Sequence, residues 1–337
     1  MTAAAHTEPP APTDGTVTYR DALARALREA MEADPKTVVL GQDVGRFSIA
    51  GVTKGLIDRF GPGRVRDCPI SESAMVGLGV GAAMNGYTTI VEMAYADIAA
   101  VAFSSIVHSA AKLPYATAGR LSCPLIVRSP INRFSRHGPM GTEVTLSWFM
   151  NVPDLDIAMP ATPDEAYWLL RHAFTRPVPT LFLEDRSLGN SAGAIGPKPA
   201  DPCRARALRA GRDVTIIAAG RLATVALKAA ETLAAARPAI DAQVMSLGMV
   251  KPLDRESILA AARATGRVLL VQEEPPYGGY GPAIQSLLDE LPADALERQP
   301  KLLARADSFL PYNREEDLLP SAADIAGAVR DLLDGRR

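Results

Sequence analysis

Short apolar segments alternate with amphipathic helical segments along both halves of this 337-residue chain. The apolar segments are hydrophobic on both faces, and the segments between them repeat apolar residues at three- and four-residue steps. This alternation is typical of parallel sheets covered by helices on both sides, so it predicts the α/β class. The predicted strands are 37–44, 88–95, 124–130, 155–161, 178–184, 213–219, 242–247, 267–273 and 301–306, and the main predicted helices are 18–34, 55–60, 98–118, 163–174, 222–236, 255–264, 281–290 and 322–333.

The chain is long enough for two domains, each with its own core. Residues 187–203 are dense in Gly, Pro and Ala and hold few large apolar side chains, as is typical of a linker. We therefore expect two domains, 16–188 and 208–337, joined by a linker at 189–207, and each domain should be a mostly parallel sheet covered by helices. Residues 1–15 are dominated by proline, alanine and threonine and should form a disordered arm.

Composition and charge exclude several classes of protein. The chain is 47% hydrophobic and 22% charged with a net charge of −2, which gives no electrostatic case for binding nucleic acid or an anionic membrane. The N-terminal residues lack the basic start and apolar core of a signal peptide, and no apolar stretch is long enough to span a bilayer. Cys68, Cys123 and Cys203 lie far apart, which predicts neither a disulfide framework nor a zinc site. We expect a cytoplasmic protein.

The segment 67–96 joins a turn, a helix and a strand, and it places a carboxylate, Glu72, in the first turn of the helix. Ser71 or Ser73 can cap this helix. Glycines at 77, 79 and 81 give it a face that another backbone can approach closely. A dinucleotide fingerprint lies instead in a turn directly after a strand, so we predict packing rather than nucleotide binding. A lone glutamate at a helix start is usually a solvated partner of the helix dipole, so its neighbours must decide its role.

Those neighbours are informative. The runs PISESAMVGLGVGAAMNG, VEMAYADI and FSSIVHSAAKLPYATAG resemble the beta subunits of thiamine-diphosphate-dependent 2-oxo acid dehydrogenases, the decarboxylating first components of the pyruvate and branched-chain complexes. The resemblance extends from about residue 17 to residue 329 and includes VKPLD and GGYG in the second half. It implies a thiamine pyrimidine-binding domain followed by a transketolase C-terminal-like domain.

The resemblance also implies roles for individual residues. Glu72 matches the glutamate that bonds a nitrogen of the cofactor's pyrimidine ring and promotes loss of a proton from its thiazolium ring. Tyr95 matches an aromatic residue that packs on the pyrimidine, although a core tyrosine at a strand end is nearly as common. Leu78 is a further candidate for cofactor contact, but Leu78, Met93 and Phe103 are more often core residues.

A diphosphate must also be held through a divalent metal. In the resembled family a Gly-Asp-Gly segment and a later asparagine on the alpha subunit do this, and the present sequence has no such segment. The chain should therefore supply the pyrimidine side of a site, while an alpha subunit holds Mg²⁺ and the diphosphate of the thiamine cofactor.

The segment 131–141 departs from the family pattern. Counted back from Trp148, the family's Gln-His-Ser-Gln falls on residues 140–143, so Gly141 stands where relatives have a histidine. Three interpretations remain open. His137 takes over the proton chemistry, for which an imidazole is suited; or Glu143 handles protons in altered chemistry; or the chain performs no dehydrogenase chemistry.

Arginines and backbone carbonyls supply the remaining candidates. Arg128, Arg133 and Arg136 can bind a substrate carboxylate or phosphate, with a solvated charged rim as the alternative. The run LDIAMPATPD resembles a family segment that holds a monovalent cation through carbonyl groups, and this makes K⁺ a candidate ligand. The candidate residues for this cation are Ile157, Ala158 and Asp164.

The leading function is the beta subunit of a 2-oxo acid decarboxylating enzyme within an α₂β₂ heterotetramer, with a lipoyl acyltransferase core as a further partner docked by the second domain. Two alternatives stay open. One is a carboligase or split transketolase-like enzyme that needs no lipoyl partner, and the other is a non-catalytic scaffold subunit.

Overall fold

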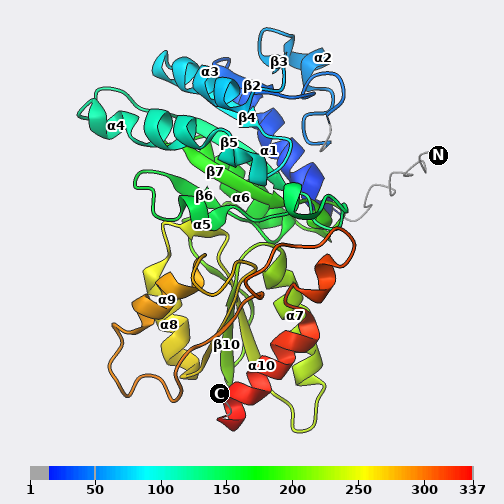
Figure 1. Ribbon diagram of the computed structural model, residues 1–337, viewed down its shortest axis with the longest axis vertical. Coiled ribbons are helices and arrows are strands. Elements are labelled where there is room, and N and C mark those ends of the chain that lie inside the picture. The colour runs from blue at the N-terminus through cyan, green and yellow to red at the C-terminus, as the bar shows by residue number, and fades with distance from the viewer. Residues whose placement is uncertain (1–14, 49–50, 336–337) are drawn as a thin grey trace, which may run out of the picture.

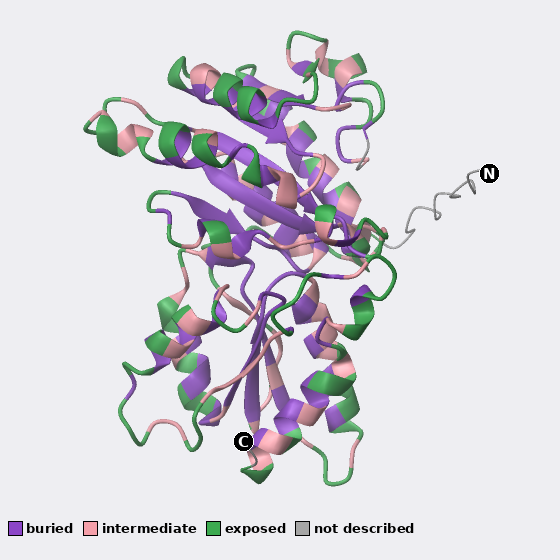
Figure 2. Cartoon of the chain, in the orientation of Figure 1, coloured by how far each residue is buried: buried purple, intermediate pink, exposed green. Residues whose placement is uncertain are grey.

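The computed structural model describes residues 15–48 and 51–335, so the arm expected at 1–15 lies almost wholly outside the described residues. Two sheets, each with helices on both faces, are stacked along the long axis of the molecule (Figure 1). The central strands of both sheets are mostly buried, the edge strands β3, β9 and β14 are partly exposed, and the helices expose one side (Figure 2). The predicted α/β class with mostly parallel sheets is confirmed.

The first sheet has seven strands in the order β12-β6-β7-β5-β4-β2-β3. Its strands are β2 (Thr37–Gly41), β3 (Val65–Asp67), β4 (Thr88–Glu92), β5 (Leu125–Ile131), β6 (Asp156–Ala158), β7 (Thr180–Asp185) and β12 (Met249–Lys251). All neighbours are parallel except β12, which pairs antiparallel with β6. Every residue of β5 is buried, as expected for a central strand covered on both faces.

Helices cover the two faces of this sheet with separate cores. On one face α1 (Tyr19–Ala33) packs against α6 (Pro163–Ala173), and the Thr18 side chain caps α1 by accepting a hydrogen bond from the Asp21 amide. The other face carries α3 (Glu72–Met84) and the π-helical segment η2 (Ser105–Ala111). Shorter elements complete this half: β1 (Val17–Thr18), α2 (Leu56–Phe60), η1 (Asp97–Ala100), α4 (Leu113–Ala116), α5 (Leu146–Phe149) and β8 (Ala192–Gly193).

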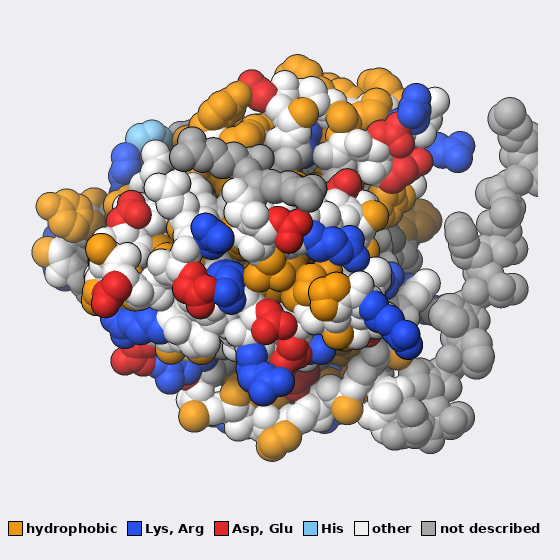
Figure 3. Space-filling view, turned by 90° about the horizontal axis from the view of Figure 1, so that it is seen from below, with side chains coloured by type: hydrophobic (Ala, Val, Ile, Leu, Met, Phe, Trp, Pro, Cys, Tyr) orange, Lys and Arg blue, Asp and Glu red, His pale blue; other side chains and the backbone are white. Residues whose placement is uncertain are grey.

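The second sheet has five strands in the order β14-β13-β10-β11-β9, and β9 is the antiparallel one. Its strands are β9 (Arg206–Arg209), β10 (Val214–Ala218), β11 (Ala242–Ser246), β13 (Val268–Val271) and β14 (Lys301–Leu303). Helices α7 (Arg221–Ala234) and α10 (Ala322–Asp334) pack together on one face, and α8 (Arg255–Thr265) packs with α9 (Gly281–Leu288) on the other. The face in Figure 3 intersperses Lys and Arg with Asp and Glu, so neither sign of charge dominates it.

Two predictions about elements need correction. The helix predicted at 98–118 is broken into η1, η2 and α4, and Pro114 marks the start of α4 because it has no amide hydrogen to continue the preceding hydrogen-bond register. The segment predicted as linker contains β8, which pairs with β1, and the start of β9. Strand β12 belongs to the second half of the sequence but extends the first sheet, so the two halves share one sheet edge. The boundaries at 188/189 and 207/208 stay a prediction.

Within the described ranges, no helix has both the length and the apolar character needed to cross a membrane.

Candidate active site

The carboxyl ends of five parallel strands meet at one edge of the first sheet, where α/β sheets place functional residues. Gln42 follows β2, Glu72 follows β3, and Tyr95, His137 and Arg186 follow β4, β5 and β7. These strands are neighbours in the sheet, with spacings of about 4.8 Å. The structure therefore brings the sequence candidates Glu72, Tyr95 and His137 to a single edge.

Glu72 opens α3 and is largely sheltered, with 8% of its surface exposed. Gln42 Nε2 donates a hydrogen bond to Glu72 Oε1 (3.1 Å), and among the described residues no donor reaches Oε2. Neither predicted cap operates: the Ser71 side chain makes no capping bond within the described chain, and Ser73 Oγ donates to the Val101 carbonyl (2.5 Å). One carboxylate oxygen of Glu72 is thus held in place and the other is available to a ligand.

Tyr95 and His137 contact each other, with ring centroids 5.3 Å apart and planes tilted by 45°. His137 is exposed, and its Nδ1 lies 2.7 Å from Ser135 Oγ and 3.2 Å from Asn132 Nδ2. Its Nε2 has no hydrogen-bond partner among the described residues. Phe134 and Arg136 adopt left-handed backbone angles (φ 58° and 61°) on either side of Ser135, and these bends turn the loop back toward Tyr95.

Gly141 leaves room for this histidine. A Cβ atom at position 141 would lie 2.8 Å from the Cβ of His137. No side chain at 141 fits while His137 keeps its place. The glycine that replaces the family's histidine therefore packs against the nearest upstream histidine.

Glu143 is engaged by groups of the second domain, and its role in proton handling stays a prediction. Arg305 forms an ion pair with both of its carboxylate oxygens (3.2 and 2.6 Å), and the Leu310 amide donates to Oε1 (3.1 Å). Both oxygens are therefore occupied by groups of the second domain, and Glu143 fixes the loop to that domain.

Arg128 does not belong to a solvated rim, because it is fully buried in the first sheet. Its guanidinium pairs with Glu92 at the end of β4 and with Glu184 in β7, and the bond from Nε to Glu184 Oε2 measures 2.9 Å. This ion triad links three neighbouring strands at the edge that carries the site.

Arg133 is also buried, and it pairs with Glu273 of the second domain and donates to the Thr142 carbonyl. Its guanidinium is therefore engaged within the chain, and a role in substrate binding stays a prediction that these contacts do not support. Arg136 is exposed and forms no ion pair with any described residue, so its role in substrate binding stays a prediction.

Leu78 lies on the outer face of α3 with 48% of its surface exposed, so it is not a core residue, and its contact with the cofactor stays a prediction. It lines an open groove of about 640 Å³ together with Gly77 and Gly81. Met93 is buried as expected, whereas Phe103 is 37% exposed.

The predicted monovalent cation site does not fit the structure. Ile157 and Ala158 lie in β6 between β7 and β12, where the backbone takes part in both ladders. Asp164 Oδ1 accepts a hydrogen bond from the Gly196 amide (2.8 Å), and Oδ2 is paired with Arg206. Within residues 15–48 and 51–335, no group of three His, Cys, Asp or Glu side chains is arranged to hold a metal ion.

Several titratable residues lie at the junction of the two domains. Glu273 and Glu274 are buried there, while Tyr277 is exposed. Burial raises the pKa of Glu274 to about 7, and burial with the nearby charge of Glu273 raises the pKa of Asp185 to about 6. Sequence reasoning missed Gln42 and Arg186. Gln42 lies inside the predicted strand 37–44, and Arg186 lies two residues beyond the predicted strand 178–184, whereas each directly follows a strand of the structure.

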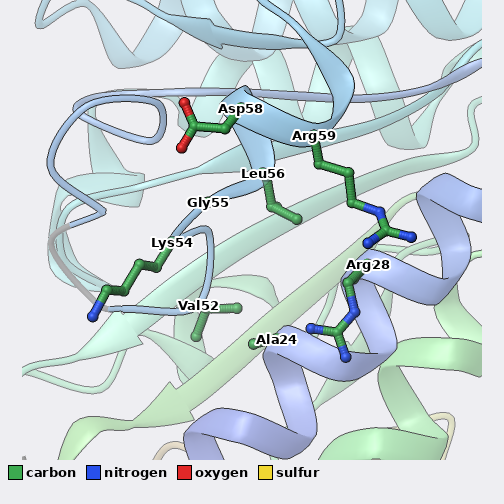
Figure 4. Close-up of a pocket in the computed structure, with 8 residues that line it drawn as sticks. All are labelled: Ala24, Arg28, Val52, Lys54, Gly55, Leu56, Asp58 and Arg59. Atoms are coloured by element: carbon green, nitrogen blue, oxygen red, sulfur yellow. The ribbon is translucent and has the colours of Figure 1, made fainter.

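A separate polar pocket of about 380 Å³ lies between α1 and α2 (Figure 4). Two arginines of its lining share one acidic partner: Arg59 Nη2 is 2.7 Å and Arg28 Nε 4.0 Å from Glu32 Oε1. The pocket contains none of the residues at the sheet edge described above, so we assign it no part in the site.

Comparison with known proteins gives matches over nearly the whole chain. Residues 15–191 match the transketolase pyrimidine binding domain and residues 204–325 match the transketolase C-terminal domain. The chain is 36% identical to pyruvate dehydrogenase E1 component subunit beta-1 of Arabidopsis thaliana, over 93% of this chain and 88% of that protein. It is also 36% identical to 2-oxoisovalerate dehydrogenase subunit beta of Bacillus subtilis, over 94% of this chain and 99% of that protein.

Among solved structures, a split-gene transketolase described as an inactive beta4 tetramer superposes with a TM-score of 0.77. The alignment covers 95% of this chain and 99% of that one at 24% identity, and it shows a shared fold.

Proposed function

The chain belongs to the family of beta subunits of the E1 components of 2-oxo acid dehydrogenases, which depend on thiamine diphosphate, and from this premise we propose that it supplies the pyrimidine side of a cofactor site shared with an alpha subunit. The observation that carries the proposal is the Glu72 carboxylate, with one oxygen held by Gln42 and the other available, at the sheet edge that also carries Tyr95 and His137.

These residues fit the pyrimidine half of thiamine diphosphate. When bound, the cofactor supplies the electron sink for loss of carbon dioxide from a 2-oxo acid. The free oxygen of Glu72 shares a proton with a ring nitrogen, and Gln42 keeps the carboxyl group oriented. Tyr95 offers an aromatic surface for ring contact.

His137 is the residue that we assign to proton transfer on the substrate side. Its Nε2 is unengaged by the described residues, and the ring is held against Tyr95 by the bent loop. The contact with Gly141 supports this assignment, because the glycine at the family's histidine position leaves the space in which His137 lies.

The diphosphate and its Mg²⁺ are assigned to the alpha subunit. The basis is the family resemblance, in which a Gly-Asp-Gly segment that this sequence lacks holds both groups. The proposal does not extend to K⁺, because the Asp164 carboxylate is occupied by Arg206 and the Gly196 amide.

An α₂β₂ assembly is proposed from the outer face of α3. This helix is apolar around its whole circumference, which is typical of a helix covered on all sides. Gly77 and Gly81 nevertheless face open space in this chain, so their backbone is accessible to another subunit. The second domain is proposed to dock the acyltransferase core. We place the assembly in the cytoplasm, in line with three free cysteines.

A carboligase is the second candidate, and the observation that favours it is Gly141. If His137 does not replace the missing histidine, acyl transfer to a lipoyl group loses its proton donor while carbon–carbon bond formation with an aldehyde remains open.

The experiment that separates these functions uses the chain co-purified with its alpha subunit. Consumption of 2-oxo acids is measured with an artificial electron acceptor and, separately, with an acceptor aldehyde. Carbon dioxide release with reduction of the electron acceptor supports the dehydrogenase, and a ligated product supports the carboligase. Neither activity, in an assembly that contains bound thiamine diphosphate, contradicts both and leaves a scaffold subunit.

A further inference from the structure

Arg186 directly follows β7 and is connected to the active-site loop. Its Nη1 donates a hydrogen bond to Asn132 Oδ1 (3.1 Å), and Asn132 Nδ2 lies 3.2 Å from His137 Nδ1. His137 in turn contacts the Tyr95 ring. The guanidinium therefore lies at the β7 end of a continuous series of contacts that leads to the residue assigned to proton transfer.

The hydrogen-bonding capacity of Arg186 is mostly unused. The side chain is half-buried, its Nε is sheltered from water without a partner, and its Nη2 makes no hydrogen bond to any described residue. It forms no ion pair within the described chain, in contrast to Arg128 and Arg133, which are paired with glutamates. Burial lowers the pKa of Arg186, and the charges of Glu184 and Glu92 oppose this, but neither carboxylate reaches it.

We propose that Arg186 binds the oxyanion of the substrate on the β7 side of the Tyr95–His137 pair. The proposal deepens the proposed function and rests on it. A guanidinium with two free N–H groups suits a planar carboxylate or a phosphate equally well. The ligand is therefore the carboxylate of a 2-oxo acid or the phosphate of a phosphorylated aldehyde acceptor.

A purely structural role for Arg186 makes a different prediction. Arg128 is paired with two glutamates, Glu92 and Glu184, and a second cation nearby offsets the surplus negative charge. In that case removing Arg186 lowers stability and leaves substrate binding unchanged.

The test compares Arg186→Gln and Arg186→Lys with the remote, exposed Arg330→Gln, each in the assembly with the alpha subunit and thiamine diphosphate. We expect Arg186→Gln to raise KM for the 2-oxo acid by about 10- to 100-fold with kcat changed by less than about threefold, since a charge-assisted hydrogen bond is lost. Arg186→Lys should recover part of the loss because it keeps the charge, and Arg330→Gln should behave as wild type.

Two further arms identify the oxyanion. If the phosphate is the ligand, KM rises for a phosphorylated aldehyde and stays constant for its unphosphorylated counterpart and for the 2-oxo acid. Unchanged KM values for all three substrates, with a lower melting temperature, overturn the proposal in favour of the structural role.

Calorimetric titration separates this proposal from the proposed function. Pyruvate and inorganic phosphate are titrated into the wild-type assembly and into the Arg186→Gln assembly. Loss of binding in the variant supports Arg186 even if the assembly turns over no substrate, in which case the proposed function fails alone. Equal affinities in both assemblies overturn the role of Arg186, whatever the activity.

Discussion

Glu72 and Gln42 form a site in which one carboxylate oxygen is bonded within the chain and the other is available to a ligand. The amide of Gln42 fixes one oxygen of the carboxylate, and the fold leaves the second without a described partner. A ligand that supplies a hydrogen bond to this second oxygen would complete the partners of the largely sheltered carboxylate. In the proposed function, this second oxygen is the one that meets the ring nitrogen of the cofactor.

Glu274 gives a prediction about pH. Burial raises its pKa from 4.5 to about 7, so between these values the folded protein keeps a proton that the unfolded chain has lost. The folded state then binds more protons, and the free energy of unfolding decreases as the pH rises through this window. Glu274→Gln should reduce the loss of stability between pH 5 and pH 8 by about 2–3 kcal/mol.

Urea denaturation of wild type and variant at the two pH values measures this effect. The exposed Glu231→Gln serves as the matched control and should leave the pH dependence as it is. A wild-type protein that is equally stable at pH 5 and pH 8 contradicts the account of Glu274.

For individual residues, the sequence suggests a role where a family motif exists. It does not reveal a role that depends on contacts between distant parts of the chain. The family pattern points to Glu72 and Tyr95, whose roles stay predictions, but it is silent about Arg186, which we propose for its unused N–H groups. Arg133 and Glu143 looked available in the sequence, and both are taken by partners more than 100 residues away, Glu273 and Arg305. Distant pairing of this kind leaves no local pattern.

Among the elements, α3 has one face that packs tightly on the sheet and another that faces open space. Gly79 packs on the sheet, where an added Cβ would lie 2.8 Å from Val91 and 2.9 Å from Leu125. Gly77 and Gly81 face outward, where an added Cβ meets nothing within 4 Å. The same residue type thus serves close packing within the chain on one face and an open approach on the other.

Alanine substitution should separate these two roles. In the isolated chain Gly77→Ala should raise the free energy of unfolding by about 0.5–1 kcal/mol, because alanine favours the helix. Gly79→Ala should lower it by about 1–3 kcal/mol through overpacking against the sheet. Urea denaturation of the single chain measures both.

If α3 faces another subunit, Gly77→Ala should weaken the assembly even though it stabilises the isolated chain. Sedimentation with the alpha subunit should then show weaker association for Gly77→Ala, despite the more stable chain. Undiminished assembly of Gly77→Ala would falsify the placement of this face at an interface.

Longer elements were predicted well because periodicity accumulates over many residues. Helices α1 and α6 and the buried strands of both sheets lie within a few residues of their predicted bounds. Strands β3, β9 and β12 have only three or four residues, too few for a pattern, and their pairing partners define them. The break in the helix predicted at 98–118 depends on the backbone hydrogen-bond register, which the pattern of apolar residues does not reveal.

For the whole molecule, the loop that carries His137 is where the two domains meet. Arg133 and Glu143 bind Glu273 and Arg305 of the second domain, and the Phe134 amide donates to Glu315 Oε2 (3.0 Å). The Phe134 ring also lies 5.0 Å below the guanidinium of Arg221. The second domain therefore holds the active-site loop in place, in addition to any contacts that it makes with partners.

The Arg133–Glu273 pair tests this arrangement. Arg133→Met leaves a buried carboxylate without its main partner and should cost about 3–5 kcal/mol of stability. The double variant Arg133→Met/Glu273→Met should recover most of that loss, because it removes the stranded charge. Thermal unfolding of Arg133→Met, Glu273→Met and the double variant, compared with wild type, gives a double-mutant cycle. Additive losses mean that the pair does not couple the domains.

The central claim is that Glu72 activates a cofactor held jointly with an alpha subunit, and the most direct measurement is turnover of 2-oxo acid by the Glu72→Gln assembly. Glutamine keeps the shape of the side chain and a hydrogen bond with Gln42 but cannot share the proton. We expect kcat to fall at least about 100-fold, while sedimentation shows the same assembly with the alpha subunit as wild type. A Glu72→Gln assembly with near-normal kcat contradicts the account.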